Sequence, residues 1–501
     1  MPCAPWHKRA SLPGDRLETG TRKLSGLPVR LVQIACGVLL AVKLAHWSLS
    51  GVFMDEAYYW MWGQHPSLSY YDHPPLNAWL LGLSSAVLGW SKLALRAPVV
   101  LTFAADVLAL YLIARRIGGD WQSHFWLTLL LFLATPVFSM VTNYALPDHA
   151  LLAALLLSIA FLFRFFSDRS DATEGRSIDL FMGALFLGLA GLAKYNAVFL
   201  GAGVVLFVLL YDRPLLRQWR IYLAGAVTLA LQLPVIFWNA SSRFASYGFI
   251  LEGRHDGLAA SLDGLPPLAL GVFIFVSPIL FWPISRFLLP GSNNIPGSGF
   301  ARTSFLISSA AITALAFTTL TLFHWNLVAY AAMLPFLATY MRPLWLVPIQ
   351  TAWGLFFAIV ILLVHTSSPE IAIKGWRDES AAWSQDWSPV AEALAEARAA
   401  NQIGFVAAAD YTTASLLGFA AKDREVVSLS SRRDQYDFWF DPEKHRGQSA
   451  ILYGDSYRPI TSSIRRQFEQ IEEIVTMPVI AGGSTVNRQS LYLARGFNPR
   501  G

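Results

Sequence analysis

Long apolar runs are the feature of this sequence that most restricts its fold. A helix of about 20 mostly apolar residues crosses the hydrocarbon core of a bilayer. Only 14% of the residues are charged, against about 25% in soluble domains. The sequence therefore predicts an all-α polytopic membrane domain over residues 31–364. About eleven transmembrane helices are expected, at 31–51, 97–115, 121–141, 147–166, 178–194, 196–211, 220–238, 266–288, 302–321, 326–341 and 344–364.

Two of these runs have an alternative interpretation. Residues 178–211 could form one kinked helix, although the polar break at Lys194-Tyr195-Asn196 and the length of the run favour two spans. The first run follows a polar tail, residues 1–30, and no small-residue cleavage site comes after it. We therefore expect it to be a membrane span and not a cleaved signal peptide.

Basic residues predict the orientation of the chain, because Lys and Arg accumulate in cytoplasmic loops. Loops rich and poor in basic residues alternate, which puts the tail 1–30 in the cytoplasm and residues 365–501 on the outer side of the membrane. In a Gram-negative bacterium this membrane is the inner membrane and the outer side is the periplasm. The cytoplasmic side holds Lys8, Arg9, Arg16, Arg22, Lys23, Arg30, Arg115, Arg116, Arg164, Arg169, Arg176, Arg213, Arg217, Arg220 and Arg342. The opposite loops hold Lys92, Arg96, Lys194, Arg243 and Arg254.

Several classes of function are excluded by what the sequence lacks. The net charge of +5 reflects the loop bias, so no nucleic-acid partner is expected. Motifs of soluble nucleotide-dependent and zinc-dependent enzymes are absent. The two cysteines, Cys3 and Cys36, exclude a disulfide framework and a cysteine-based zinc site. We expect no required cofactor; a divalent metal is compatible with the sequence but not indicated by it.

Residues 365–501 contain no spanning run and predict a small periplasmic α/β domain. Short strands are expected at Ile403–Ala409, Val426–Leu429, Ala450–Tyr453 and Ser490–Ala494, alternating with helices near 412–421 and 462–473. A further helix over 388–400 has Ser388 as a candidate N-cap and Pro389 in its first turn.

The first outer loop, 52–95, carries the most unusual polar residues of the chain. Asp55-Glu56 directly follows a membrane span, where a carboxylate is costly unless it is solvated or used. Aromatic residues and a second acidic site, Asp72-His73, follow in the same loop. An apolar stretch after Pro74-Pro75 suggests helices that lie in the membrane interface. The alternative is an aromatic belt with carboxylates at helix starts. The second acidic site, Asp72-His73, favours a functional role of the loop.

A further carboxylate and three cations lie at outer helix ends. Asp148 follows Pro147 at the start of the fourth span, where it is a candidate site residue or only complements the helix dipole. Lys194, Arg243 and Arg254 are scarce cations of this face. Each is either a candidate partner of an anionic group such as a phosphate or a solvated surface residue.

At these residues the sequence resembles bacterial glycosyltransferases of the GT-C fold. The relevant branch includes protein O-mannosyltransferases, the aminoarabinose transferase of lipid A and rhizobial lipopolysaccharide galacturonosyltransferases. The resemblance covers nearly the whole chain. It rests on the segments 55–60 (DEAYYW), 70–76 (YYDHPPL), 146–148 (LPD), 191–195 (GLAKY), 234–239 (PVIFWN), 324–326 (HWN) and 434–439 (DQYDFW).

The resemblance implies a GT-C membrane domain and a sugar donor of polyprenyl-phosphate type, used on the outer face. It implies that Asp55 is the catalytic carboxylate, with Glu56, Asp72 and Asp148 as supporting acids. The acceptor is expected to be lipid A, lipopolysaccharide or another envelope glycan. Candidate substrate-binding residues are Tyr58, Tyr59, Tyr71, Asp72, His73, Lys194, Arg243, Arg254 and His324.

One position departs from the pattern of the aminoarabinose transferases. Where they have Glu-Lys-Pro-Pro, this chain has Asp72-His73-Pro74-Pro75. A fixed cation is thus replaced by a titratable imidazole, which argues against aminoarabinose as the sugar.

The same residues fit the chemistry of sugar transfer. A base must take the proton of the acceptor, and positive charge must stabilise the departing lipid phosphate. Two rival functions remain: a transporter or flippase of lipid-linked sugars, which should show inverted repeats and broken helices, and a non-catalytic membrane partner. Within the enzyme class, a protein O-glycosyltransferase is the alternative.

Overall fold

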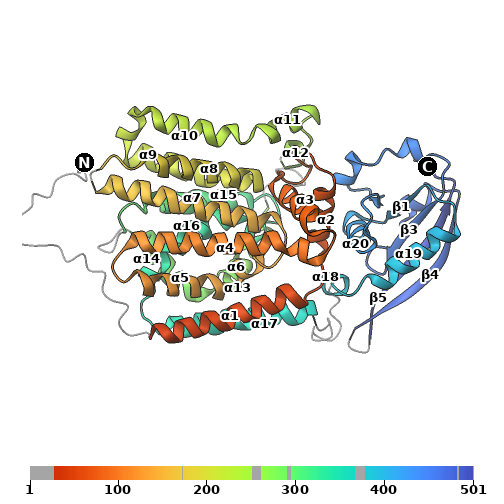
Figure 1. Ribbon diagram of the computed structural model, residues 1–501, viewed down its shortest axis with the longest axis horizontal. Coiled ribbons are helices and arrows are strands. Elements are labelled where there is room, and N and C mark those ends of the chain that lie inside the picture. Colours follow the sequence, from red (N-terminus) through yellow and green to blue (C-terminus); the bar gives the residue numbers. More distant parts are fainter. Residues whose placement is uncertain are drawn as a thin grey trace, which may run out of the picture.

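The computed structural model describes residues 28–171, 173–250, 261–289, 295–366, 379–481 and 484–499. A bundle of helices forms the larger part, and a smaller part containing a sheet lies at one end of it (Figure 1). Two short helices, α2 (Met54–Gln64) and α3 (Leu76–Leu88), lie between the bundle and the sheet. Both belong to the outer loop 52–95, where the sequence predicts helices.

Each predicted span coincides with a helix or with a broken helix. The bundle contains α1 (Val29–Leu49), α4 (Lys92–Ile117), α5 (Trp121–Ala134), α6 (Pro136–Val141), α7 (Pro147–Ser170), α8 (Ser177–Ala193), α9 (Val198–Tyr211), α10 (Trp219–Ala230), α11 (Leu233–Ser241), α12 (Ala245–Gly248), α13 (Leu265–Phe275), α14 (Phe281–Leu288), α15 (Gly299–Leu315), α16 (Leu327–Tyr340) and α17 (Leu346–Thr366). Among the described residues, four helices (α1, α4, α7 and α17) are long and apolar enough to cross a membrane by themselves. Two bent pairs raise this number to six. The count of eleven crossings stays a prediction.

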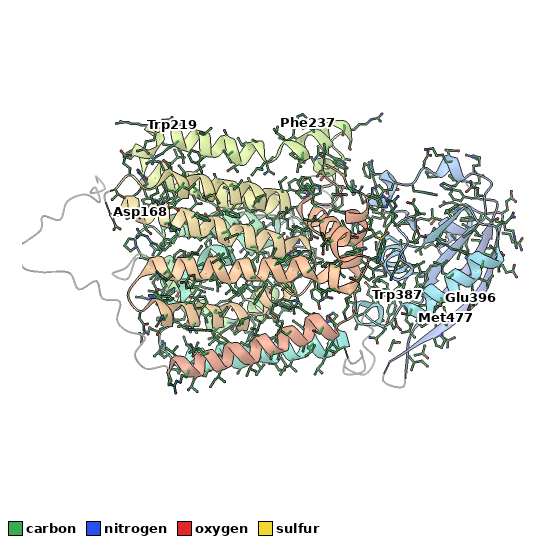
Figure 2. The ribbon with its side chains drawn as sticks, viewed as in Figure 1. Asp168, Trp219, Phe237, Trp387, Glu396 and Met477 are labelled. Carbon is green, nitrogen blue, oxygen red and sulfur yellow. The ribbon has the colours of Figure 1, made fainter. Side chains whose placement is uncertain are left out.

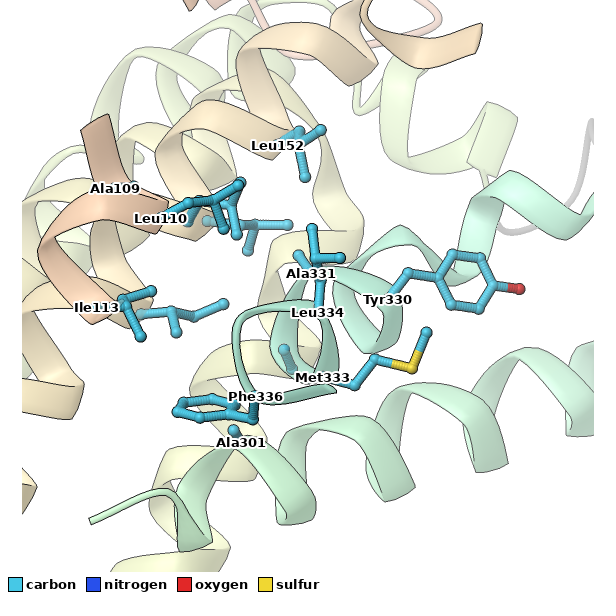
Figure 3. Close-up of a cluster of buried hydrophobic side chains, with 14 of the residues drawn as sticks. Ala109, Leu110, Ile113, Leu152, Ala301, Tyr330, Ala331, Met333, Leu334 and Phe336 are labelled. Carbon is cyan, nitrogen blue, oxygen red and sulfur yellow. The ribbon is translucent and has the colours of Figure 1, made fainter. Parts of the chain in front are cut away.

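Two helices, α7 and α16, form the centre of the bundle. Every residue of α16 except Thr339 is buried, as expected for a helix that is apolar on all faces. Its side chains pack against α4, α7 and α15, for example Leu334 and Phe336 beside Leu110 and Ile113 (Figure 3). This packing gives the outer helix ends a rigid base.

Three of the predicted straight spans are broken, and one of them, 220–238, bends by 44° between α10 and α11. The run 266–288 bends by 82° between α13 and the segment that starts at Pro278. Ser277, at the bend, has a φ of 82°, and its hydroxyl donates to Gln350 Oε1 at 2.7 Å. Pro278 disfavours a helical conformation of the preceding residue, so the helix ends there. The run 121–141 is likewise divided, at Thr135-Pro136.

The break predicted at Lys194 is present. α8 ends at Ala193, Lys194 is extended, and a 3₁₀ turn, η1 (Tyr195–Ala197), leads into α9. The two-span interpretation of 178–211 therefore fits the observed helices better than a single kinked helix does.

The C-terminal part contains a five-stranded sheet. Its strands are β1 (Phe405–Ala408), β2 (Val427–Ser428), β3 (Ala450–Asp455), β4 (Gln470–Ala481) and β5 (Ser484–Arg495), in the order β2-β1-β3-β5-β4. β1 pairs in parallel with β2 and β3, and β5 pairs antiparallel with β3 and β4. The helices of this part are α18 (Glu379–Trp383), α19 (Ser388–Ala400), α20 (Tyr411–Ala421) and α21 (Ser462–Arg465). The predicted α/β class is confirmed.

Two local predictions in this part are wrong. The helix expected near 462–473 ends at Arg465, and β4 begins at Gln470. Pairing with β5 determines the conformation here, because strand formation depends on cross-strand partners more than on local preference. Ser388 is the first residue of α19 and not its N-cap; its N–H and hydroxyl both donate to Asp386 Oδ1.

The helical and C-terminal parts are joined through α2 and α20. α20 packs against α2 and also against β1, β2 and β3. The two helices approach closely at Gly418, where an added Cβ atom would lie 2.9 Å from Cε of Met61. One buried apolar cluster runs from the aromatic residues of α2 into the sheet. The outer loop is thus packed between the helical bundle and the C-terminal part.

Candidate active site

Glu56 fixes the start of α2. Its carboxylate accepts hydrogen bonds from the backbone N–H groups of Phe53 (3.0 Å) and Ala145 (2.7 Å) and forms an ion pair with Arg96 (2.8 Å). The Glu56 side chain is fully buried. Arg96 also donates to the carbonyl oxygens of Gly51 and Asn143, both at 3.0 Å. This pair therefore ties α2 to α4 and to the segment that leads into α7.

Asp55 lies beside this anchor, in the first turn of α2, and is half-buried. A carboxylate at this position complements the dipole of the helix N-terminus. Burial, followed by the charge of Asp55, raises the pKa of Tyr411 to about 12. The Asp55 carboxylate therefore interacts electrostatically with Tyr411, the first residue of α20.

Tyr58 and Tyr59 connect the Asp55 side of α2 to Asp72 and His73. Residues three and four apart share one face of a helix, so both rings lie on the Asp55 side of α2. The Tyr58 hydroxyl donates to Asp72 Oδ2 at 2.6 Å, and the Tyr59 ring lies 5.9 Å from the His73 ring. Burial, then the Asp72 carboxylate, raises the pKa of Tyr58, so this phenol stays protonated and acts as a donor.

Asp148 forms a buried ion pair with Lys194. The ammonium group lies 2.9 and 3.0 Å from the two carboxylate oxygens, and each side chain is 7% exposed. The charges of His324 and His73 also act on this carboxylate. Lys194 and two candidate histidines, His73 and His324, therefore lie near Asp148, and His73 also lies beside Tyr59 on the Asp55 side of α2.

The C-terminal part contributes residues that the sequence analysis missed. Arg432 lies 3.5 Å from Asp72 Oδ1, its guanidinium covers the Tyr411 ring at 4.9 Å, and its side chain is 50% exposed. Gln435 donates its backbone N–H to the Tyr58 hydroxyl (3.0 Å) and accepts from the backbone N–H of Tyr71 (2.7 Å). The Arg432-Arg433 pair just before the segment 434–439 was the available signal.

The remaining candidates lie outside this cluster. Tyr71 is buried, with its ring 4.7 Å from Phe249 and 5.7 Å from Phe438. Arg243 is exposed in the turn after α11, with a φ of 54°, and forms no ion pair with an acid of the described residues. Arg254 lies outside the described residues. The described ranges contain no group of three or more His, Cys, Asp or Glu residues that could hold a metal ion.

The buried Asp434 carboxyl group should make the stability of the protein depend on pH. It is buried, and its carboxylate accepts from the Tyr436 backbone N–H at 2.8 Å. Burial, then repulsion by Asp437 and Asp72, raises its pKa to about 7. A raised carboxyl pKa stabilises the fold fully below the unfolded value of about 3.9, and this contribution is lost as the pH rises through about 7.

We expect Asp434→Asn to abolish this dependence, because an amide does not titrate. The measurement is the thermal midpoint of both proteins in detergent between pH 5 and 8.5. The wild-type midpoint should fall relative to the variant between pH 5 and about 7 and stay level above that. A difference between the two proteins that is constant over this range would contradict the assignment.

The fold defines a structural class: the chain has the GT-C fold. Residues 72–238 match the family model described as dolichyl-phosphate-mannose-protein mannosyltransferase. The resemblance found in the sequence is thereby confirmed.

Individual relatives agree with this class. The lipid A galacturonosyltransferase RgtD of Rhizobium johnstonii is 29% identical over 207 residues, a match that spans 40% of this chain and 41% of the relative. ArnT from Cupriavidus metallidurans, in a crystal structure bound to undecaprenyl phosphate, superposes with a TM-score of 0.66 at 14% identity. That match covers 93% of this chain and 98% of ArnT. The apo structure of the same ArnT gives 0.65 at 13% identity.

Proposed function

We propose that this protein is a membrane glycosyltransferase that moves a sugar from a polyprenyl-phosphate donor to a lipid acceptor of the lipid A or lipopolysaccharide type. One observation carries the proposal. Asp55 lies in the first turn of α2, next to the buried Glu56–Arg96 ion pair. On the same side of α2, Tyr58 donates to Asp72 and the Tyr59 ring lies beside His73. The names of RgtD and ArnT support a lipid acceptor and a lipid-phosphate ligand.

Asp55 acts as the general base in this reaction. It takes the proton of the acceptor hydroxyl while that oxygen attacks the anomeric carbon of the sugar. The bond between the anomeric carbon and the phosphate oxygen breaks, and the polyprenyl phosphate leaves with the electron pair. Where the acceptor is itself a phosphate, no proton needs to be removed, and Asp55 orients the reacting groups.

The cations around Asp148 stabilise the leaving phosphate. Lys194 carries a fixed charge, while His73 and His324 can add further donors when protonated. Arg432, half-exposed beside Asp72, is the cation of the C-terminal part that is best placed to bind an anionic group of a substrate. Glu56 does not need to touch the substrate; it positions Asp55 through Arg96 and Ala145.

The proposed topology follows the distribution of charge. The N-terminus lies in the cytoplasm and the C-terminal part in the periplasm, because the basic loops alternate in that sense. The donor then reaches the site laterally within the outer leaflet, with its prenyl chain among the aromatic residues of the outer loop.

Lys194 should bind the donor phosphate directly, in addition to forming its ion pair with Asp148. Lys194→Gln removes a charge-assisted hydrogen bond to phosphate, which lowers affinity by about 10- to 100-fold. The variant also leaves Asp148 buried without its partner, so Lys194→Gln with Asp148→Asn is the matched control for folding. The measurement is binding of undecaprenyl phosphate to the purified protein in nanodiscs. Wild-type affinity in the folded double variant would contradict the role of Lys194.

Two other functions make different demands on the molecule. A protein acceptor is favoured by the description of the matching family model and would require transfer to peptide hydroxyls. A flippase is favoured by the 82° break between α13 and α14. At that break, however, the polar side chains are bonded to each other: Ser277 donates to Gln350, and Gln350 donates to the Ala134 carbonyl at 2.9 Å.

A further inference from the structure

A large groove opens between the C-terminal part and the outer end of the bundle. Its volume is about 1480 Å³, more than the roughly 300–1,000 Å³ of an ordinary small-molecule pocket. One wall consists of the starts of β1 and β2 together with residues 435–440, and the other of residues 64–67 and the end of α11. Asp55, Asp72 and Asp148 do not line it. The groove is therefore distinct from the acidic cluster, and its volume can hold a ligand larger than an ordinary small molecule.

Aromatic rings line this groove in fixed orientations. The Trp439 ring stacks on His65, with 4.3 Å between centroids and 21° between planes. Trp238 lies 5.5 Å from Phe438. Both pairs join the C-terminal part to the helical part, and Phe438, Trp439 and Phe440 are only half-buried. Such rings offer flat apolar faces to a ligand without further loss of conformational freedom.

The polar lining includes five amides, beside serines, two histidines, two arginines and a glutamate. Gln64, Asn401, Gln402, Gln435 and Gln448 line the groove, and an amide both donates and accepts hydrogen bonds. The cations in the lining are already neutralised, since Arg398 pairs with Asp423 and Arg424 pairs with Glu425. A ligand rich in hydroxyl groups and apolar C–H faces matches this lining better than a phosphate or a strongly anionic chain does.

The groove adjoins the acidic cluster at Gln435 and Tyr436, and the Tyr436 ring stacks on Tyr58 with 6.2 Å between centroids. Gln435 lines the groove, and its backbone N–H donates to the Tyr58 hydroxyl that in turn binds Asp72. At its other edge the groove is bordered by Trp238 and Ser242, at the end of a bent apolar pair (α10 and α11) that is long enough to span a membrane. A lipid-anchored chain can thus follow the groove from the membrane edge towards the acids.

We propose that this groove binds the saccharide chain of the glycolipid acceptor. The proposal rests on the proposed function and adds a second binding site, outside the acidic cluster, that selects acceptors by their sugars. An extended peptide fits less well, because the edge strand β2 is only two residues long and offers little backbone pairing.

Binding can be tested without any transfer reaction. The probe is the soluble oligosaccharide released from lipopolysaccharide by mild acid, and the readout is saturation-transfer NMR with the full-length protein in nanodiscs. Trp439→Ala should weaken binding about tenfold or more, as expected for an aromatic anchor. Gln402→Ala, at an exposed position, should weaken it about two- to tenfold by loss of one hydrogen bond. Trp219→Ala is the control, since Trp219 is 72% exposed at the far end of α10 (Figure 2).

Undecaprenyl-phosphate binding, measured on the same proteins, separates this inference from the proposed function. Loss of saccharide binding in Trp439→Ala and Gln402→Ala, with lipid-phosphate binding unchanged, supports the groove. Equal saccharide binding by all variants, no binding by wild type, or binding of an unglycosylated peptide in place of the saccharide would overturn it. Failure of wild type to bind undecaprenyl phosphate, with saccharide binding intact, would instead count against the proposed donor.

Discussion

In the Asp55→Asn variant, turnover of the lipid-linked sugar is expected to fall about 100-fold or more while donor binding stays close to wild type. The substitution keeps the size of the side chain and its place at the start of α2, but it removes the proton acceptor. General-base catalysis contributes about 10²–10⁴-fold to a rate, and this contribution is lost. The measurement is kcat for sugar transfer together with the Kd for the donor lipid, at matched protein amounts.

Two carboxylates provide the comparison for Asp55. Glu56→Gln should lower the yield of folded protein, and the molecules that fold should retain more turnover than Asp55→Asn. Asp148→Asn tests whether the essential acid belongs to α7 instead. Near-normal kcat in a folded Asp55→Asn protein would show that Asp55 only complements the helix dipole.

Arg96→Met is expected to destabilise the protein by about 3–5 kcal/mol, because it leaves the buried Glu56 carboxylate without its counter-charge. Burial already raises the pKa of Glu56, and Arg96 opposes that rise. Without Arg96 the carboxyl group should take up a proton more readily, so the loss should be smaller at pH 5 than at pH 8. Denaturant unfolding in detergent at both pH values measures the effect.

An exposed ion pair supplies the control for Arg96. Arg446 and Glu443 are 44% and 49% exposed at 2.7 Å, so Arg446→Met should change stability by no more than about 1 kcal/mol. The double variant Glu56→Gln with Arg96→Met should recover part of the loss, since no buried charge is then left alone. Equal, small effects of Arg96→Met and Arg446→Met would mean that the buried pair does not anchor α2.

The sequence predicted those features that are local to one segment. Apolar runs located every helix of the bundle except the short α12, and the polar Lys194 marked the end of α8. The acidic residues of the outer loop could be found because Asp55 and Asp72 stand out against an apolar background. The bend at Ser277-Pro278 also had a local signal, since a residue before proline avoids the helical conformation.

Features that depend on distant contacts could not be predicted in this way. Asp148 and Lys194 were separate candidates, and only the packing of α7 against α8 brings them within hydrogen-bond distance. Arg432 comes from the C-terminal part, 360 positions from its partner Asp72. Glu56 resembled a second catalytic acid because neither Arg96 nor the Ala145 N–H is near it in the sequence.

The central claim, sugar transfer from a lipid phosphate, is tested most directly by reconstitution. Purified protein in nanodiscs is incubated with lipid A and a panel of undecaprenyl-phosphate sugars, and the lipids are analysed by mass spectrometry. We expect the mass of the acceptor to increase by one sugar with one donor of the panel, with equimolar release of undecaprenyl phosphate and no product from Asp55→Asn. Unchanged donor and acceptor masses across the panel, with folded protein that binds undecaprenyl phosphate, would contradict the claim.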